Sequence, residues 1–507
     1  MTDPFQDAMA AGYGFDDPSI VLGSPIIDGK VAAPAHVRVP LAMLNRHGLI
    51  AGATGTGKTR TLQLLAHQLS KAGVPVFCAD MKGDLTGLAA AGQTNPKLES
   101  RVQAIGIPFE PSACPVEFLS LSGTNGQQLR ATVSSFGPLL LGRVLDCNDT
   151  QQSVLSLVFK YCDDKGLLLL DLADLKQVLT WLTNEGAAEL KEYGGVTKAS
   201  AGVILRKVIE LEQQGAEQFF GEPEFDVDDL LRNDANGRGV VSVLELTDLQ
   251  DRPALFSTFM MWLLASLWRE LPEVGDVEKP KLVFFFDEAH LLFDNASKAF
   301  QDQIEHVVRL IRSKGVGVFF VTQTPKDVPA DVLAQLGNRV QHALRAFTPD
   351  DEAKLNATAR TFPKSAFYDI PATLTSLGIG EALVTVMSPR GTPTPVVATL
   401  MVPPSSSMTA LDTAAVTRQV QSSPLHGRYA QAIDRESARE VLMARVKAAV
   451  DAADEAFPTA RPPRREQQST AGKVASAVLK SSVVAALGRE LVRGVFGVLG
   501  LKKPRRR

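Results

Sequence analysis

The sequence predicts an α/β fold in which a mainly parallel central sheet is interrupted by a helical insertion. Residues 46–80 follow the order strand, loop, helix, strand within about 35 residues, which is typical of parallel sheets. Short apolar runs alternate with helical patterns again between residues 235 and 402. Residues 121–234, in contrast, carry apolar side chains at helical spacing with few strand signals. Together these patterns indicate a sheet whose early and late strands are separated by helices.

Changes in composition set the expected domain boundaries. After Val402 the segment PPSSSMT ends the sheet pattern, and TARPPRREQQ has the composition of a flexible linker. The expected parts are a short β-rich segment at 1–45, the α/β core at 46–120 and 235–402, the helical insertion at 121–234, a helical segment at 403–458 with a helix near 430–457, and a basic Gly/Ala-rich tail at 459–507.

Individual elements follow from the period of the apolar residues. Residues 59–71 place leucines at helical spacing, and two further helices are expected around 251–270 and 298–314. Alternating or continuous apolar runs bounded by Gly and Pro predict strands. These expected strands are 19–22, 25–28, 36–39, 47–52, 74–80, 239–246, 281–287, 317–322, 339–347 and 381–387.

Composition narrows the class of protein. The chain is 45% hydrophobic and 21% charged, which is ordinary for a globular protein. Its 4 cysteines form no CxxC pair, which argues against a zinc module or a disulfide framework and favours a cytoplasmic location. No run of 18 apolar residues occurs, so we expect no transmembrane segment, and the acidic N-terminus does not have the pattern of a signal peptide.

The net charge of −3 conceals an uneven distribution. Residues 459–507 contain 12 Lys/Arg and 2 Asp/Glu, so the tail is basic and the remaining body acidic. Local fields rather than whole-chain charge decide the binding of anions. The acidic total therefore does not exclude a nucleic acid or an anionic membrane surface as a partner.

A glycine-rich loop predicts a nucleotide site. The stretch Gly52, Ala53, Thr54, Gly55, Thr56, Gly57, Lys58, Thr59 matches G-x-x-x-x-G-K-[ST], leaves a strand and opens a helix, and Arg60 follows. The glycines allow backbone N–H groups to surround phosphate oxygens, and the helix N-terminus favours the same charge. Lys58 is expected to reach the β- and γ-phosphates, and the Thr59 hydroxyl is expected to bind Mg²⁺. The pattern thus predicts ATP and Mg²⁺ as cofactors, although GTP stays open.

Two acids close an apolar strand later in the chain. Residues 281–286 read KLVFFF and are followed by Asp287 and Glu288. A buried carboxylate requires a partner, which a metal ion and an attacking water would supply. Asp287 is expected to hold Mg²⁺ through its water shell, and Glu288 to orient or deprotonate the nucleophilic water. A strand that merely ends in an acidic loop is the alternative.

Other polar residues have less specific signals. Gln323 follows the next apolar strand and is a candidate sensor of the γ-phosphate, with an ordinary loop amide as the alternative. Arg312 is the preferred arginine for donation to a neighbouring subunit's site, ahead of Arg309 and Arg339, although each could instead be solvated or salt-bridged. Asp80, with Lys82 and Asp84, ends the second core strand, where a site role and a polar turn both fit. His47 and His290 are expected to serve packing or supporting roles.

The segments RHGLIAGATGTGKT, ADMKGDLTG, VFFFDEAHLLF and RLIRSKGVGVFFVTQ together resemble the HerA/FtsK superfamily of RecA-like motor ATPases, and its bacterial HerA-like branch in particular. The similarity covers most of residues 15–400. It implies a RecA-like P-loop NTPase core, ATP hydrolysis, a homo-oligomeric ring with six subunits favoured, and ATP sites between subunits. It also assigns Arg312 as the trans-acting arginine and Gln323 as the polar sensor. The segment before the glycine-rich loop is short for the β-barrel of HerA proper, so nuclease docking is not expected.

Two functions remain open from the sequence. The first is a DNA-translocating or helicase-like motor, since Lys/Arg contacts to phosphate give sequence-independent affinity. The second is an ATP-dependent switch or assembly factor that moves no polymer and contacts a membrane surface or partner protein through the basic tail. In the second case the location would be peripheral, at the inner face of the membrane. A solubilising, disordered end is the remaining interpretation of the tail.

Overall fold

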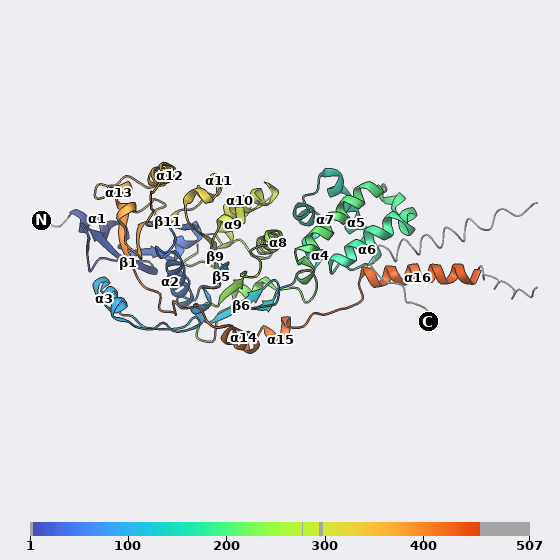
Figure 1. Cartoon of the computed structure of the whole chain (residues 1–507), viewed down its shortest axis with the longest axis horizontal. Helices are drawn as coiled ribbons and strands as arrows, with labels where there is room; N and C mark the ends of the chain where they lie inside the picture. Colours follow the sequence, from blue (N-terminus) through green and yellow to red (C-terminus); the bar gives the residue numbers. More distant parts are fainter. Residues whose placement is uncertain (1–3, 276, 294–297, 457–507) are drawn as a thin grey trace, which may run out of the picture. The chain divides into compact units, whose positions relative to one another are not determined.

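The computed structural model describes residues 4–275, 277–293 and 298–456. The chain divides into two units, 1–448 and 449–507, and of the second only the final residues of one helix, 449–456, are described. The expected basic tail at 459–507 lies outside the described residues. The remainder of this description concerns the first unit (Figure 1).

A single sheet forms the centre of this unit. In the described residues it has 13 strands, in the order β2-β1-β13-β12-β11-β4-β10-β9-β5-β8-β6-β7, with β3 paired to β1. The run from β11 to β7 is parallel, whereas β11 pairs with β12 antiparallel and the pairs beyond it towards β2 are antiparallel too. The prediction of a mainly parallel α/β sheet is confirmed. The strands are β1 (Ser19–Ile27), β2 (Lys30–Val31), β3 (Val37–Pro40), β4 (Gly48–Ala51), β5 (Val76–Asp80), β6 (Val116–Ser120), β7 (Gln127–Gln128), β8 (Val241–Glu245), β9 (Leu282–Phe286), β10 (Val316–Thr322), β11 (Asn338–His342), β12 (Glu381–Thr385) and β13 (Val397–Met401).

The central strands are buried on both faces, which explains their continuous apolar sequences. Their register places the carboxyl ends together: Ala51 of β4 lies opposite Thr322 of β10, and Phe286 of β9 lies opposite Phe320 of β10. Residues that directly follow these strands therefore share one edge of the sheet.

Helices cover both faces of the sheet. On one face α1 and α2 pack with the sheet in an apolar cluster that includes Leu62, Leu65 and Phe285. On the other, α8 and α10 pack in a second cluster that includes Phe259 and Phe284. The helices are α1 (Pro4–Tyr13), α2 (Lys58–Lys71), α3 (Pro96–Ile105), α4 (Val133–Val144), α5 (Asp149–Lys165), α6 (Leu172–Thr183), α7 (Lys198–Gln213), α8 (Pro253–Glu270), α9 (His290–Phe293), α10 (Lys298–Ile311), α11 (Ala330–Leu333), α12 (Pro349–Ala359), α13 (Ile370–Ser376), α14 (Thr413–Ser422), α15 (His426–Tyr429) and α16 (Ala438–Ala456).

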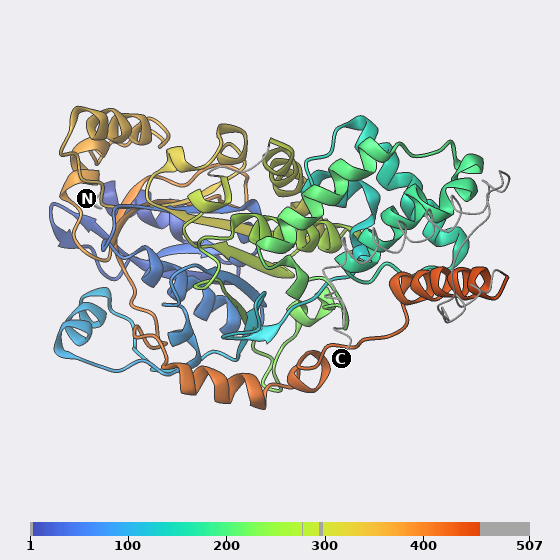
Figure 2. The same cartoon turned by 45° about the vertical axis from the view of Figure 1, so that its right-hand side comes forward.

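The helices α4 to α7 form the insertion between β7 and β8, as the helical periodicity predicts (Figure 2). Their apolar side chains belong to the same cluster as those of α8 and the adjacent sheet face. For example, Phe219, at the end of the insertion, contacts Phe259 and Trp262 of α8 edge to face or nearly so, with ring centroids 5.9 and 6.1 Å apart. The insertion is thus packed on the core rather than folded around a separate centre.

The structure departs from the sequence expectation in several elements. Residues 4–13 form a helix, α1, where short strands and turns were expected for 1–45, because Phe5, Met9 and Tyr13 recur at a spacing of four and are all buried. Residues 19–27 form one strand rather than two. Strands β6 and β13 and helices α3, α12 and α13 were not predicted. Within the described residues, no helix combines the length and apolar character needed to cross a bilayer.

Candidate nucleotide and metal site

The glycine-rich loop connects β4 to α2 at the carboxyl edge of the sheet. The N–H of Gly52 donates to the carbonyls of Thr322 and Gln323 at 3.3 and 3.2 Å, and that of Ala53 donates to Ala343 O at 2.9 Å. Gly57, the N-cap of α2, has φ of 119° and no side chain caps the helix. The first N–H groups of α2 therefore remain available to an anion, and the positive end of the helix dipole faces the same place.

The loop that contains Gly380 supports the second half of the glycine-rich loop. The N–H of Gly380 donates to Thr56 O at 2.9 Å, and a Cβ at Gly57 would lie 3.3 Å from Gly380 Cα. The Thr61 hydroxyl contacts His342 Nε2 at 2.9 Å, and His342 Nδ1 contacts Glu381 O at 2.9 Å. Burial lowers the pKa of His342 to about 4, so the neutral ring donates from Nδ1 and accepts at Nε2. These contacts fix the start of α2 to β11 and β12.

Lys58, the first residue of α2, is buried and folds back over the loop. Its Nζ donates to Gly52 O at 2.9 Å and to Ala53 O at 3.3 Å. Burial lowers the pKa of Lys58, while the carboxylates of Glu288 and Asp287 act in the opposite direction. The lysine ammonium and the acidic pair are therefore close enough to interact, although more than 200 residues separate them in the sequence.

The acidic pair follows β9 and is buried, each residue being 5% exposed. Asp287 Oδ1 accepts the N–H of Glu288 at 3.0 Å, whereas Oδ2 has no hydrogen-bond partner in the described structure. Burial, followed by the charge of Glu288, raises the pKa of Asp287 to about 7. Glu288 has φ of 48°, a left-handed conformation that is strained for a residue with a side chain.

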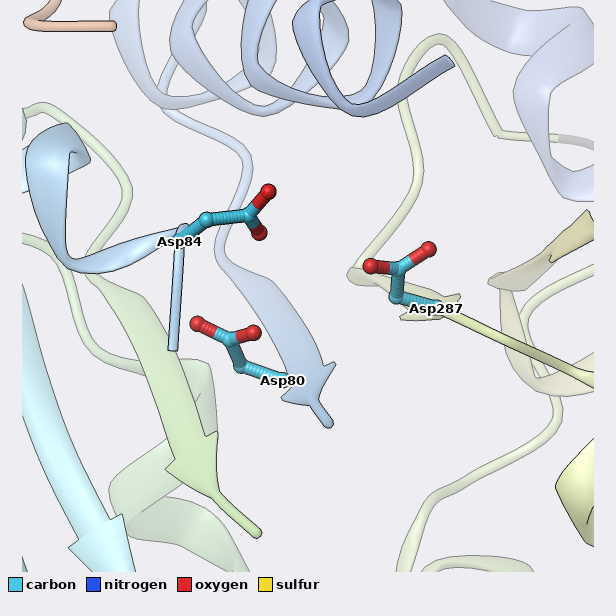
Figure 3. Close-up of side chains that lie close together, drawn as sticks. All are labelled: Asp80, Asp84 and Asp287. Atoms are coloured by element: carbon cyan, nitrogen blue, oxygen red, sulfur yellow. The ribbon is translucent and has the colours of Figure 1, made fainter. Parts of the chain in front are cut away.

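Three aspartates form a carboxylate cluster beside α2. Oxygens of Asp80, Asp84 and Asp287 lie within 4.8 Å of one another, and the three carboxylates face a common space (Figure 3). Asp80 organises the turn after β5, because its two oxygens accept the N–H groups of Lys82, Gly83 and Leu85 at 3.1, 2.8 and 2.8 Å. Asp84 Oδ1 and Asp287 Oδ2 are buried without hydrogen-bond partners in the described structure. Unpaired carboxylate oxygens are the donors that Mg²⁺ prefers, so this part of the site fits the cation.

A family model described as "Helicase HerA-like C-terminal" matches residues 27–505. The chain belongs to this HerA-like helicase family.

Two archaeal relatives are similar to the HerA-like chain over much of its length. The DNA double-strand break repair helicase HerA of Sulfolobus acidocaldarius is 21% identical over 371 residues, and that of Sulfurisphaera tokodaii is 22% identical over 370 residues. Each alignment covers 71% of this chain but 66% of the relative, so the chain spans slightly less than two thirds of those proteins. Among solved structures, the conjugative coupling protein TrwB is 15% identical with a TM-score of 0.49, covering 78% of this chain and 92% of TrwB. VirB4 of Thermoanaerobacter pseudethanolicus is also 15% identical, with a TM-score of 0.48 over 77% of this chain and 98% of VirB4.

Gln323 of the HerA-like chain lies next to the glycine-rich loop, as the strand order requires. Its backbone carbonyl accepts from Gly52, and its side chain is exposed. It borders a cavity of about 190 Å³ that reaches Ala53 on one side and Arg345 and Lys354 on the other. This position is compatible with contact to a bound phosphate. The sensor role itself stays a prediction.

Arg312 lies at the opposite edge of the sheet. It begins the short 3₁₀ turn Arg312–Lys314 just before β10, and its charge contributes to the low pKa of His47 at the start of β4, which burial lowers to about 4. The seven residues of β10 separate it from the loop, a span of roughly 20 Å at ~3.3 Å per residue. Arg312 thus does not reach the site of its own chain. Arg309 is exposed on α10. Arg339 is the second residue of β11, lies opposite Leu49 of β4 and donates to Thr361 O at 3.3 Å.

The other predicted residues take ordinary positions. Thr59 is the second residue of α2 and half-buried, and its metal role stays a prediction. Arg60 donates to Gln63 Oε1 at 2.8 Å. Burial lowers the pKa of Arg60, and the charge of Asp84 acts in the opposite direction. His47 Nδ1 accepts the N–H of Val318 at 3.1 Å, and His290 Nδ1 lies 3.3 Å from Glu288 Oε2.

The sequence alone assigned no definite role to one lysine and one glutamate that lie near the site. Lys82 contacts Glu288 through its ammonium group. Glu245 ends β8 beside Asp80 and is buried with Oε1 unpaired in the described structure. The only sequence signal for both was their place at the end of a core strand, because the contacts join segments that are far apart in the chain.

Proposed function

We propose that this HerA-like chain binds Mg-ATP, hydrolyses it to ADP and phosphate, and uses the cycle to move DNA through a ring of identical subunits. One observation carries the ATPase part: the loop lysine and the two carboxylates after β9 meet at one edge of the sheet, where Lys58 interacts with Glu288 and Asp287. A buried ammonium, an uncapped helix N-terminus and unpaired carboxylate oxygens together fit a metal-bound polyphosphate.

Each residue has a role in this proposal. The N–H groups of residues 52–57 and the start of α2 hold the phosphates, and Lys58 neutralises the β- and γ-phosphate oxygens. Thr59 and Asp287 would hold Mg²⁺, which when bound offsets charge on the phosphate oxygens. Glu288 Oε2 is buried and makes no hydrogen bond in the described structure, with His290 Nδ1 3.3 Å away, so it can orient a water and accept its proton. The strained backbone at Glu288 supports such a role because strain of this kind persists where the surroundings fix it.

Arg312 and Gln323 complete the proposal between subunits. Since Arg312 lies at the amino edge of the sheet, it can act only on a neighbour's site. A ring, with six subunits favoured by the resemblance, would bring it there, and an arginine supplied in this way stabilises transition-state charge. Gln323 would contact the γ-phosphate from the chain that binds it.

DNA as the moved polymer is the part of the proposal with the least direct support. It rests on the family and on the names of the two HerA relatives, which this chain matches over part of their length. The alternative of a switch acting through the basic tail depends on residues outside the described structure. No described residue favours that alternative.

The ATPase proposal is tested with two substitutions. Lys58→Ala should remove hydrolysis while the unfolding temperature stays near that of the wild type. Glu288→Gln should still bind ATP but turn over at least ~10²-fold more slowly, the usual loss for a positioned base. Normal hydrolysis by a folded Lys58→Ala chain would refute the assigned site.

The motor proposal is tested by the ATPase rate with and without long duplex DNA, using the full chain and a chain that ends at Pro458. Stimulation in both proteins supports the motor. Absence of stimulation, together with liposome binding that the truncation removes, would instead support the switch. Particle images with a slowly hydrolysed nucleotide provide a second readout, since a ring around duplex DNA needs a lumen about 20 Å wide.

A further inference from the structure

Lys82 holds the proposed catalytic base. Its Nζ donates to Glu288 Oε1 and forms an ion pair with it. The Glu288 side chain is 7% exposed, whereas that of Lys82 is 49% exposed. The pair therefore joins a buried carboxylate to a lysine that solvent, or a bound molecule, can reach.

The backbone that carries Lys82 is fixed independently of this pair. Asp80 accepts three N–H groups of the turn, including that of Lys82, and Gln250 Nε2 donates to Met81 O at 2.7 Å. The turn thus places the start of the lysine side chain beside Glu288. The four-carbon stem beyond it can still rotate, which distinguishes lysine from a rigid partner.

Lys82 and Lys58 face the same carboxylates. Burial is the main cause that lowers the pKa of Lys58, and the positive charge of Lys82 lowers it further, whereas the charge of Glu288 raises it. Asp287 and Glu288 act on both lysines. Lys82 therefore lies on the side of the loop at which Lys58 is expected to meet the terminal phosphates.

We propose that Lys82 binds the γ-phosphate of a bound triphosphate and releases Glu288 as it does so. This inference rests on the proposed ATPase function. A nucleoside diphosphate lacks the γ-phosphate, so with ADP the lysine stays on Glu288 and the carboxylate oxygen Oε1 stays occupied. With ATP the ammonium gains a doubly charged oxygen group, and Glu288, no longer neutralised by the lysine, becomes a stronger base towards a water at its carboxylate. Through Lys82, both the preference of the site for ATP over ADP and the availability of Glu288 as a base would depend on the γ-phosphate.

The binding test uses the full chain with Glu288→Gln, which should bind ATP and hydrolyse it at least ~10²-fold more slowly. Adding Lys82→Met should weaken ATP binding by ~10-fold or more, the range for loss of a charge-assisted hydrogen bond, while ADP binding changes by less than about twofold. Lys82→Arg should retain most of the preference for ATP. Lys160→Met is the matched control, because Lys160 also pairs with a carboxylate, Asp164, but lies on α5 in the insertion. Its ratio of ATP to ADP affinity should equal that of the parent.

The kinetic test separates phosphate binding from a purely structural contact. With Glu288 intact, Lys82→Met should raise KM for ATP more than it lowers kcat. A fall in kcat at unchanged KM, or an equal loss of ATP and ADP binding, would overturn the inference. An unchanged ATP preference in a chain that still binds ADP would overturn it as well, while leaving the ATPase proposal in place. Failure of the wild-type chain to bind either nucleotide would instead refute the proposed function from which the inference starts.

Discussion

Replacing Glu245 by glutamine should make the protein more stable, and increasingly so as the pH rises. Glu245 ends β8, is 4% exposed, and has one oxygen without a hydrogen-bond partner in the described structure. Burial, followed by the charges of Asp80, Asp248 and Asp84, raises the pKa of Glu245 from 4.5 to about 8. An acid whose pKa is higher in the folded state binds protons more tightly there. Its contribution to stability is therefore present at low pH and is lost as the pH rises from 4.5 through 8.

The size of the effect follows from these two pKa values. The raised pKa of Glu245 lowers the free energy of unfolding by about 1 kcal/mol at pH 5, about 3 kcal/mol at pH 7 and about 5 kcal/mol at pH 9. Glutamine has the same shape and no charge, so Glu245→Gln should remove this cost. The measurement is the midpoint of urea unfolding of both proteins at the three pH values, without nucleotide or metal.

The same chemical change on the next strand should have the opposite sign. Glu117 of β6 accepts from Arg232 Nη2 at 3.1 Å and from the Ser423 hydroxyl. Glu117→Gln weakens this partly buried pair and should destabilise the protein by about 1–3 kcal/mol. If both substitutions destabilise the chain, or if the benefit at Glu245 does not grow with pH, the assigned cost of the buried charge is wrong.

Three further results are expected. Gly57→Ala should impair nucleotide binding and lower the free energy of unfolding by about 1–3 kcal/mol, because φ of Gly57 is 119° and the new Cβ would meet Gly380. ADP affinity and the midpoint of urea unfolding test this prediction, and unchanged values would contradict it. Arg312→Ala should bind ATP normally but hydrolyse it at least ~10³-fold more slowly. Mixing this variant with Lys58→Ala chains should restore part of the rate, because a mixed ring pairs an intact loop in one subunit with an intact arginine in the next. If no activity returns, the arginine does not act between subunits. The free energy of unfolding should fall as the pH drops from 6.5 towards 4. Burial lowers the pKa of His47, His67 and His342 to about 4, so these histidines take up protons more readily in the unfolded chain. Replacing His67 by glutamine should therefore reduce the slope of the free energy of unfolding against pH.

The parts of the site that the sequence predicts are those encoded locally. The glycine-rich loop is a contiguous motif whose strand and helix neighbours are also readable, so its position follows directly. Asp287 and Glu288 could be predicted because their strand is continuously apolar up to the first acid. The position of Arg312 also follows from strand direction, since a residue that precedes a parallel strand must lie at the edge opposite the residues that follow it.

What the sequence could not supply are contacts between distant segments. Lys82 and Glu288 are 206 residues apart, and nothing in either segment specifies the other. Strand β6 was missed because Glu117 interrupts its apolar run, and the distant partners Arg232 and Ser423 make that glutamate acceptable in a buried strand. Helix α1 was overlooked because its large apolar residues are separated by small or polar ones, and its burial depends on packing against remote residues such as Phe367.

The shared apolar cluster of the insertion and α8 has a mechanical consequence. Trp262 and Phe259 of α8 contact the insertion residue Phe219, and Phe259 also stacks with Phe77 of β5, with ring centroids 6.5 Å apart. Strand β5 ends in Asp80, which shapes the turn that carries Lys82 to Glu288. Because close-packed rings leave little free volume, a displacement of that turn would be transmitted through Phe77, Phe259 and Phe219 to the helices of the insertion.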